Sequence, residues 1–184
     1  MQRKKLTKPI SGLLLAFAAA AFAGSCALAG GGNPVQGSWE LKEVKTNGTT
    51  QQTYPITDTS DVDGDNTDET VEFHFYYEFS NDVINIYWEY LVTDDPGSDT
   101  VDTSQAPWGL YKIADYSGDS YSAQDGSVDY VTISGVELEA EYSTGNGELT
   151  ITYSYGGDSV TIIYEATSKD FSGAAELDSS NSPY

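Results

Sequence analysis

A run of closely spaced acidic residues is the part of the sequence whose residue types are best suited to bind a metal ion. Positions 61–69 read Asp-Val-Asp-Gly-Asp-Asn-Thr-Asp-Glu, and aspartates at alternate positions are typical of calcium-binding loops, because Ca²⁺ prefers hard oxygen ligands. The calcium loops that lie between paired helices have glycine at the sixth position, whereas Gly64 is the fourth residue here. A solvated acidic loop without a metal is therefore the alternative. The candidate ligands are Asp61, Asp63, Asp65, Asp68 and Glu69.

Residues suited to catalysis are few. His74 is the only histidine and Cys26 the only cysteine. A nucleophile needs a base within hydrogen-bond reach, and the sequence places no serine beside His74. The zinc motifs C-x-x-C and H-E-x-x-H, the phosphate-binding loop and the nucleophile motif G-x-S-x-G do not occur either. We expect no catalytic residues and no enzymatic activity. We also expect no cofactor, and a bound calcium ion is the alternative.

The chain is strongly acidic, with 29 acidic and eight basic residues. Four of the basic residues lie in the first eight positions, and the remainder of the chain has four lysines and no arginine. Nucleic-acid binding depends on Lys and Arg contacts with phosphate, so we expect none. We also expect no electrostatic attraction to anionic lipid head groups. Self-repulsion that favours solubility is the simplest role for the charge, and attraction of cations or cationic partners is the alternative.

The N-terminal segment has the pattern of a signal peptide. Basic residues precede an apolar run from Leu13 to Ala23, and this run is shorter than the roughly 20 residues that a spanning helix needs. Residues 23–26, Ala-Gly-Ser-Cys, resemble the lipobox of bacterial lipoproteins, with Ala23 where that family prefers leucine. The resemblance implies cleavage before Cys26 and lipid on its thiol, which would anchor the protein in the bacterial cell envelope, at the periplasmic or surface face of the outer membrane. Ordinary secretion, with cleavage after Ala29, is the alternative.

After a Gly-rich tether, the sequence alternates between short β-like segments and turn signals. Apolar and polar residues alternate most clearly late in the chain, and this period of two predicts antiparallel strands with one solvated face. Tight hairpins are predicted at residues 145–147 and 156–158, where Gly and Asn supply positive φ. The predicted strands are 37–45, 71–79, 83–92, 109–115, 128–134, 136–142, 148–155 and 160–167.

The first of these segments contains the sequence Gly37-Ser38-Trp39. It resembles the G-x-W signature of lipocalins in sequence and in position, just after the tether, and the resemblance covers about residues 36–170. The resemblance implies an all-β, eight-stranded, antiparallel up-and-down barrel, with residues 46–70 covering its mouth. It also implies barrel closure by Gly37, Trp39 and a basic residue, for which Lys169 is the candidate. An antiparallel β-sandwich is the alternative fold.

Aromatic side chains share one face of several predicted strands. Such a face either forms a filled core, with tyrosine hydroxyls at the surface, or lines a cavity with a few polar groups. The first function that we expect is binding of a small apolar or amphipathic ligand in the barrel. The alternative is an acidic β-domain that contacts a protein or calcium without a ligand cavity. The candidate ligand-binding residues are Phe75, Tyr77, Trp88, Tyr90, Tyr153, Tyr155 and Tyr164.

The expected organisation is a signal peptide (1–25), a lipidated cysteine with tether (26–36), the barrel (37–170) and a tail (171–184).

Overall fold

The computed structural model describes residues 35–80, 83–97, 100–104, 107–117, 123–124, 127–133 and 136–177. The predicted signal peptide, Cys26 and most of the predicted tether lie outside these residues. Twelve strands and no helix occur in the described part of the chain, so the all-β prediction is confirmed. Among these residues, no helix is long and apolar enough to cross a membrane.

The strands include every segment that was predicted. The eight predicted segments correspond to β1, β4, β5, β6 and β8 to β11. In chain order the strands are β1 (Gly37–Thr46), β2 (Thr49–Thr53), β3 (Ile56–Ser60), β4 (Glu69–Ser80), β5 (Val83–Asp94), β6 (Gly109–Ser117), β7 (Ala123–Gln124), β8 (Ser127–Ile133), β9 (Val136–Gly145), β10 (Glu148–Tyr155), β11 (Asp158–Ala166) and β12 (Ala175–Glu176).

Left-handed residues form the tight turns between the last three long strands. Asn146 and Gly147 have φ values of 53° and 80°, and Gly156 and Gly157 have values of 62° and 95°. Two-residue hairpins with positive φ match the right-handed twist of the strands that they join. The turns β9–β10 and β10–β11 therefore lie where the sequence predicts them.

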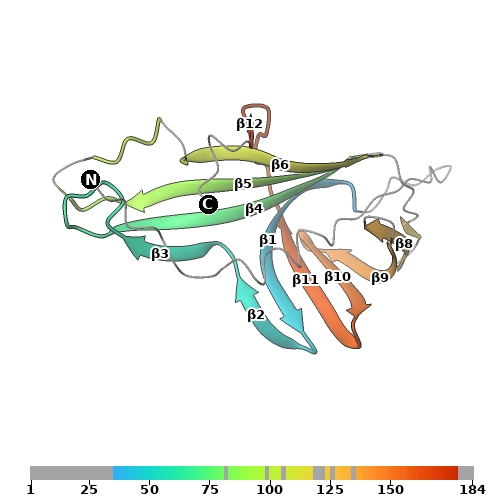
Figure 1. The fold of residues 1–184 in the computed structure, drawn as a ribbon. Coiled ribbons are helices and arrows are strands. Elements are labelled where there is room, and N and C mark those ends of the chain that lie inside the picture. The colour runs from blue at the N-terminus through green and yellow to red at the C-terminus, as the bar shows by residue number, and fades with distance from the viewer. Residues whose placement is uncertain are drawn as a thin grey trace.

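The strands form one sheet, in the order β12-β6-β5-β4-β1-β11-β10-β9-β8-β7, with β2 paired to β1 and β3 paired to β4. Consecutive long strands are antiparallel neighbours except β6 and β8, and the first long strand pairs with the last, from Trp39 opposite Ala166 to Thr46 opposite Val160. In Figure 1, β4, β5 and β6 run together as one group, whereas β1, β11, β10 and β9 fan away from them. The predicted up-and-down order is thus present.

The sheet is not closed into a barrel, and in this respect the structure differs from the predicted eight-stranded barrel. Closure would require β6 to pair with β8, and the described strands do not form this ladder. Short strands occupy the two edges instead. β12 runs parallel to β6 with Ala175 opposite Tyr111, and β7 pairs with the start of β8. The free edge of a strand has one row of backbone N–H and C=O groups. The pairings of β12 with β6 and of β7 with β8 use some of the groups that a β6–β8 ladder would need.

Four short strands, β2, β3, β7 and β12, were not predicted. β2 and β3 lie in residues 46–70, where a long loop over the barrel mouth was expected, and they pair with the edges of β1 and β4. β12 lies in the predicted C-terminal tail. β2 is polar and mostly exposed, so it lacks the alternation that identifies a half-buried strand. Short, polar strands are typical of exposed sheet edges.

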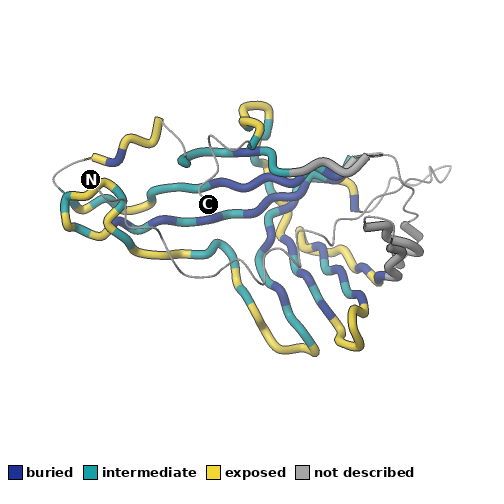
Figure 2. The backbone as a smooth tube through the Cα atoms, viewed as in Figure 1, coloured by how far each residue is buried: buried dark blue, intermediate teal, exposed yellow. Residues whose placement is uncertain are grey.

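Most of the buried apolar side chains lie on one face of this sheet and form one cluster, whereas Tyr76 and Tyr87 are buried outside it, on the other face. β4 shows the alternation, because Phe73, Phe75, Tyr77 and Phe79 belong to the cluster and the residues between them face the other side. β10 and β11 contribute alternate residues in the same way. The sheet bends along β1, which pairs with β4 over residues 37–40 and with β2 over residues 43–46. Figure 2 shows buried segments along β4, β5, β1, β11 and β10.

Candidate functional sites

The acidic run lies where two connections of the sheet meet. Residues 61–68 join β3 to β4, and Glu69 is the first residue of β4. β4 and β5 form an antiparallel pair in which Thr70 is opposite Asp94. Asp95, which follows directly after β5, is therefore brought to the acidic run by the register of this pair. Asp95 was not predicted as a site residue, because it is distant in the sequence and no local pattern connects it to position 69.

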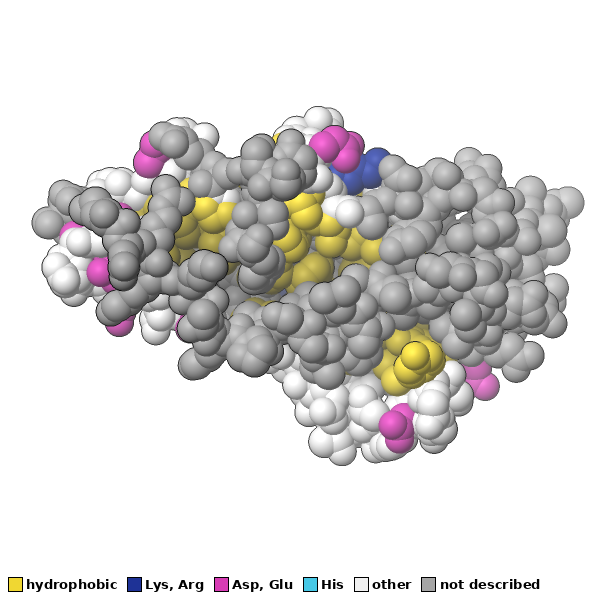
Figure 3. Space-filling view, viewed as in Figure 1, with side chains coloured by type: hydrophobic (Ala, Val, Ile, Leu, Met, Phe, Trp, Pro, Cys, Tyr) yellow, Lys and Arg dark blue, Asp and Glu magenta, His cyan; other side chains and the backbone are white. Residues whose placement is uncertain are grey.

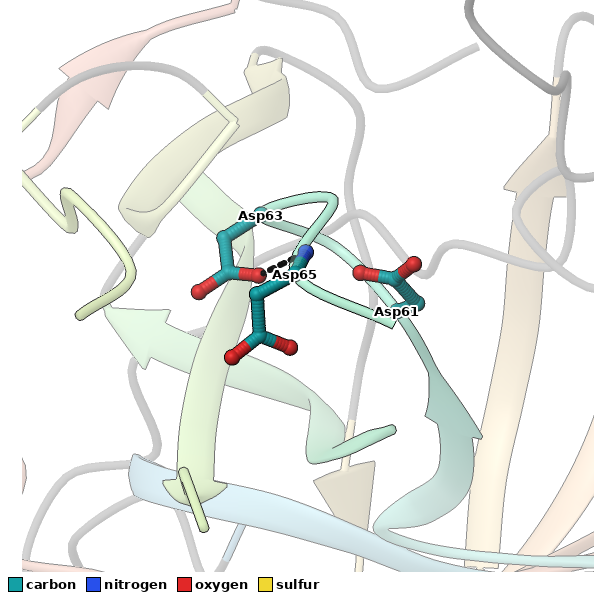
Figure 4. Close-up of side chains that lie close together, drawn as sticks. All are labelled: Asp61, Asp63 and Asp65. Carbon is teal, nitrogen blue, oxygen red and sulfur yellow. Dashed lines mark hydrogen bonds between the residues drawn. The ribbon is translucent and has the colours of Figure 1, made fainter. Parts of the chain in front are cut away.

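Three aspartates form a compact turn within the run. Asp61 accepts hydrogen bonds from the backbone N–H groups of Gly64 (2.7 Å) and Asn66 (3.3 Å). Asp63 accepts one from the backbone N–H of Asp65 (3.0 Å), which is the dashed line in Figure 4. The turn bends at Gly64 and Asn66, with φ values of 91° and 72°. One carboxylate oxygen of each aspartate lies within 4.8 Å of the corresponding oxygens of the other two.

A second group of carboxylates shares Asp63 with this turn. One oxygen from each of Asp63, Glu69 and Asp95 lies within 4.8 Å of those of the other two. Glu69 is fully buried; its Oε2 accepts a hydrogen bond from Val62 N (2.7 Å), and its buried Oε1 has no hydrogen-bond partner. Asp95 is held in the same way. Its Oδ2 accepts a hydrogen bond from Val101 N (3.1 Å), and its buried Oδ1 has no hydrogen-bond partner. Both carboxylates thus keep one desolvated oxygen.

The structure therefore brings together four of the five predicted ligands and adds one. Asp68 is exposed and belongs to neither group of carboxylates, so its inclusion in the predicted site is not supported. Gly64 does not occupy the sixth position of the run, but Asn66 does, and it has the positive φ that glycine adopts in calcium loops. The left-handed conformation is tolerated by asparagine more readily than by most other residues.

The predicted ligand-binding aromatic residues lie together, with one exception. Phe75, Tyr77, Trp88, Tyr153 and Tyr164 are buried in the one core cluster, and Tyr90 packs against it. Tyr77 and Tyr164 meet edge-on with ring centroids 5.1 Å apart. Tyr155 is 66% exposed at the end of β10 and lies outside the cluster. The side chain of Tyr155 therefore cannot line the same face, because the strand alternation ends at the β10–β11 turn.

Burial within this cluster affects the tyrosine hydroxyls. Burial raises the pKa of Tyr54 to about 12. Burial, followed by the proximity of Tyr155, raises the pKa of Tyr153 to about 12. Tyr164 is almost completely buried, and burial raises its pKa well above the ordinary value. These phenols are neutral at physiological pH and can act as hydrogen-bond donors to a polar group at this face.

The predicted barrel-closing residues do not form a single cluster. Gly37 and Trp39 lie in β1, and the buried indole Nε1 of Trp39 donates a hydrogen bond to the carbonyl of Val35 (2.9 Å). Trp39 is opposite Tyr77, on the apolar face. Lys169 lies on the other face, where it pairs with Glu89 (2.5 Å) and its Nζ is 5.8 Å from the ring centroid of Tyr76. The expected contact between Lys169 and Trp39 is therefore replaced by an ion pair, because the buried carboxylate of Glu89 requires a basic partner.

His74 connects neighbouring strands on this other face. Its Nδ1 lies 2.8 Å from Glu40 Oε1, and its Nε2 lies 3.2 Å from Glu72 Oε2. Lys42 Nζ is 2.8 Å from the second oxygen of Glu40. Burial would raise the pKa of Glu40, but the hydrogen bonds from Lys42 and His74 outweigh it and hold this pKa below its ordinary value. Because both ring nitrogens face carboxylates, we interpret His74 as a link between β1 and β4.

Comparisons of this chain with protein-family models, with curated proteins and with solved structures found no match. The interpretation of the sites therefore depends on the residues of this chain and on their geometry.

Proposed function

We propose that this protein is an exported lipoprotein, anchored through lipid on Cys26, whose lipocalin-like β-domain binds a small apolar or amphipathic ligand. The order of the strands supports the lipocalin-like part of this proposal. Seven of the ladders of an eight-stranded up-and-down barrel are present, including the one between β1 and β11. The ladder that is missing among the described strands is the one between β6 and β8.

The observation that carries the ligand-binding proposal is the continuous aromatic face. Residues from both halves of the sheet, β4 with β5 on one side and β10 with β11 on the other, belong to one cluster. In Figure 3, hydrophobic side chains reach the surface over β4 and β5. Ligand sites are mostly apolar with a few polar groups, and the neutral phenols of the cluster supply such groups. The ligand class is therefore apolar or amphipathic rather than charged.

Native mass spectrometry and displacement of a fluorescent fatty acid test this proposal directly. The sample is exported Cys26→Ser protein, which lacks the lipid and therefore needs no detergent. We expect saturable binding of fatty-acid-like probes with one ligand per chain. Tyr90→Ala should weaken binding, because Tyr90 packs at the edge of the cluster. Tyr155→Ala is the matched control and should leave binding unchanged, because Tyr155 is exposed and outside the cluster.

The absence of binding across a panel of fatty acids, phospholipids and sterols would contradict ligand binding by the aromatic face. It would favour the second candidate function, an acidic domain that contacts another protein or a cation. The observation behind that candidate is the pair of carboxylate groups at residues 61–69 and 95.

The anchor is tested separately by following Cys26→Ser in cell fractions. A lipid with two or three acyl chains holds a protein stably on a membrane, whereas the acidic surface of this chain is repelled by anionic lipids. Cys26→Ser should therefore leave the membrane fraction entirely. Ser25→Ala is the control and should remain bound. Retention of Cys26→Ser on the membrane would contradict the proposed anchor.

A further inference from the structure

The second carboxylate group differs from an ordinary acidic surface cluster because two of its three members, Glu69 and Asp95, each have one desolvated oxygen. Oε1 of Glu69 and Oδ1 of Asp95 are both buried and lack a hydrogen-bond partner. Glu69 as a whole has no exposed surface. Burying a carboxylate is strongly unfavourable unless it is paired with an opposite charge or binds a metal ion. The two unpartnered oxygens therefore indicate a missing positive charge at this position.

The protein itself does not supply that charge within the described residues. Three of the four lysines in this part of the chain pair with other carboxylates: Lys42 with Glu40 and Glu165, Lys45 with Glu43, and Lys169 with Glu89. Neither Glu69 nor Asp95 forms an ion pair in the described part of the chain, and both have carboxylate neighbours. Repulsion between like charges adds to the burial penalty. A bound cation would remove both unfavourable contributions.

We propose that Asp63, Glu69 and Asp95 bind one Ca²⁺ ion, with Asp61 and Asp65 beside it on the same turn. Three carboxylate oxygens mutually within 4.8 Å fit around one Ca²⁺, since Ca–O distances of about 2.3–2.6 Å allow ligands on opposite sides of the ion to lie about 5 Å apart. The remaining coordination positions can be filled by water and by the further oxygens of Asp61 and Asp65. This site is independent of ligand binding at the aromatic face.

The donor set favours calcium over other divalent ions. Every proposed protein ligand is a carboxylate, whereas zinc sites are built mainly from imidazole and thiolate. His74, the only histidine, has both ring nitrogens beside Glu40 and Glu72. Mg²⁺ demands near-ideal octahedral geometry and retains several waters, whereas Ca²⁺ accepts a variable set of six to eight oxygens. Carboxylates held by backbone N–H groups from two connections suit the larger and less demanding ion.

The proposal gives the ion a structural consequence. Asp63 belongs to the β3–β4 connection, Glu69 to the start of β4, and Asp95 to the segment after β5. The two connections already touch, because a Cβ at Gly97 would lie only 2.4 Å from Oδ2 of Asp65. A cation bound by all three carboxylates would hold this end of the β3-β4-β5 group together. Calcium would therefore raise the stability of the protein by binding the native state alone.

The test uses the full chain, purified in detergent and freed of divalent ions with EDTA. Isothermal titration with CaCl₂ should show one ion per chain, and Ca²⁺ should raise the thermal midpoint. MgCl₂ at the same concentration should have a much smaller effect. The absence of both binding heat and a midpoint shift with Ca²⁺ would overturn the proposal.

The Glu69→Gln variant tests whether Glu69 is a metal ligand or only supports the fold. Without metal, Glu69→Gln should melt at a higher temperature than the unchanged protein, because it removes a buried, uncompensated charge. With Ca²⁺, it should bind at least tenfold more weakly and lose the rise in midpoint. Asp68→Asn is the matched control, since it removes an exposed charge one residue away and should keep Ca²⁺ binding. Asp95→Asn makes the same test if Glu69→Gln does not fold. Unaltered Ca²⁺ affinity in both variants would overturn the assignment.

Discussion

Lys169 Nζ lies 2.5 Å from Oε1 of Glu89, an almost completely buried carboxylate on the face of the sheet that is opposite the main core. The second oxygen of Glu89 accepts a hydrogen bond from the hydroxyl of Tyr76 (3.0 Å). Two residues further along the chain, the ring of Phe171 stacks on Tyr87 with centroids 4.3 Å apart and planes 6° apart. The C-terminal segment is thus attached to the outer face of β4 and β5, and it continues into β12 beside β6.

We expect Lys169→Met to lower the free energy of unfolding by about 3 kcal/mol, because removing one partner leaves the other charge buried and unpaired. The double variant Lys169→Met with Glu89→Gln should recover most of this loss, since Gln carries no charge and still accepts a bond from Tyr76. Lys45→Met is the control, because its ion pair with Glu43 is partly exposed and contributes less than about 1 kcal/mol. Urea denaturation measures all three. Equal losses for Lys169→Met and Lys45→Met would contradict a buried ion pair.

Acid should weaken the contact between β1 and β4. The pKa of Glu40 is depressed in the folded protein despite its burial, because Lys42 and His74 donate hydrogen bonds to the carboxylate. A carboxyl group with a depressed folded pKa contributes stability above its unfolded pKa, and the contribution is lost as the pH falls through the folded value. The thermal midpoint should therefore decline below the ordinary Glu pKa of about 4.3. Glu40→Gln should show a shallower decline, and identical pH profiles would exclude this role of Glu40.

Alkaline pH should destabilise the core through its buried phenols. Burial and the nearby Tyr155 raise the pKa of Tyr153 to about 12, whereas an unfolded tyrosine titrates near 10. A group whose pKa is raised on folding contributes stability that is complete below the unfolded pKa and is lost as the pH rises through the folded pKa. Unfolding above pH about 10 should therefore coincide with phenolate absorbance. Tyr153→Phe should shift this alkaline transition to higher pH; if the transition does not move, another group controls it.

The β1–β2 turn is attached to the β10–β11 turn through one asparagine. Asn47 has a φ of 50°, donates from Nδ2 to Asp158 Oδ1 (2.7 Å) and accepts from Ser159 N (2.9 Å). Asn47→Ala removes both side-chain hydrogen bonds and places alanine in a left-handed conformation, so we expect a loss of about 2–3 kcal/mol.

Asn47→Gly is the matched variant, because glycine accepts the positive φ and only the side-chain bonds are lost. Its expected cost is about 1–2 kcal/mol. Thermal or urea unfolding distinguishes the two contributions. If glycine proves as destabilising as alanine, backbone conformation has no part in the effect.

The amino-acid sequence alone determined the long strands and several of their turns. All eight predicted segments are strands, because the period-two alternation that identifies a half-buried strand is a local property. The turns at residues 145–147 and 156–158 are also local, since they require left-handed backbone that Gly and Asn adopt at little cost. The aromatic face follows from the same alternation, except at Tyr155, where β10 ends.

Only the tertiary structure decided which distant residues meet. Asp95 joins Asp63 and Glu69 because the register of β4 and β5 places Thr70 opposite Asp94. Lys169 faces Glu89 rather than Trp39 because the segment after β11 crosses to the outer face, where a buried carboxylate binds it. The sheet is open between β6 and β8, and β12 and β7 lie beside the two edges that closure would pair. Register and edge pairing depend on contacts between segments far apart in the chain, and no local pattern of residue types encodes them.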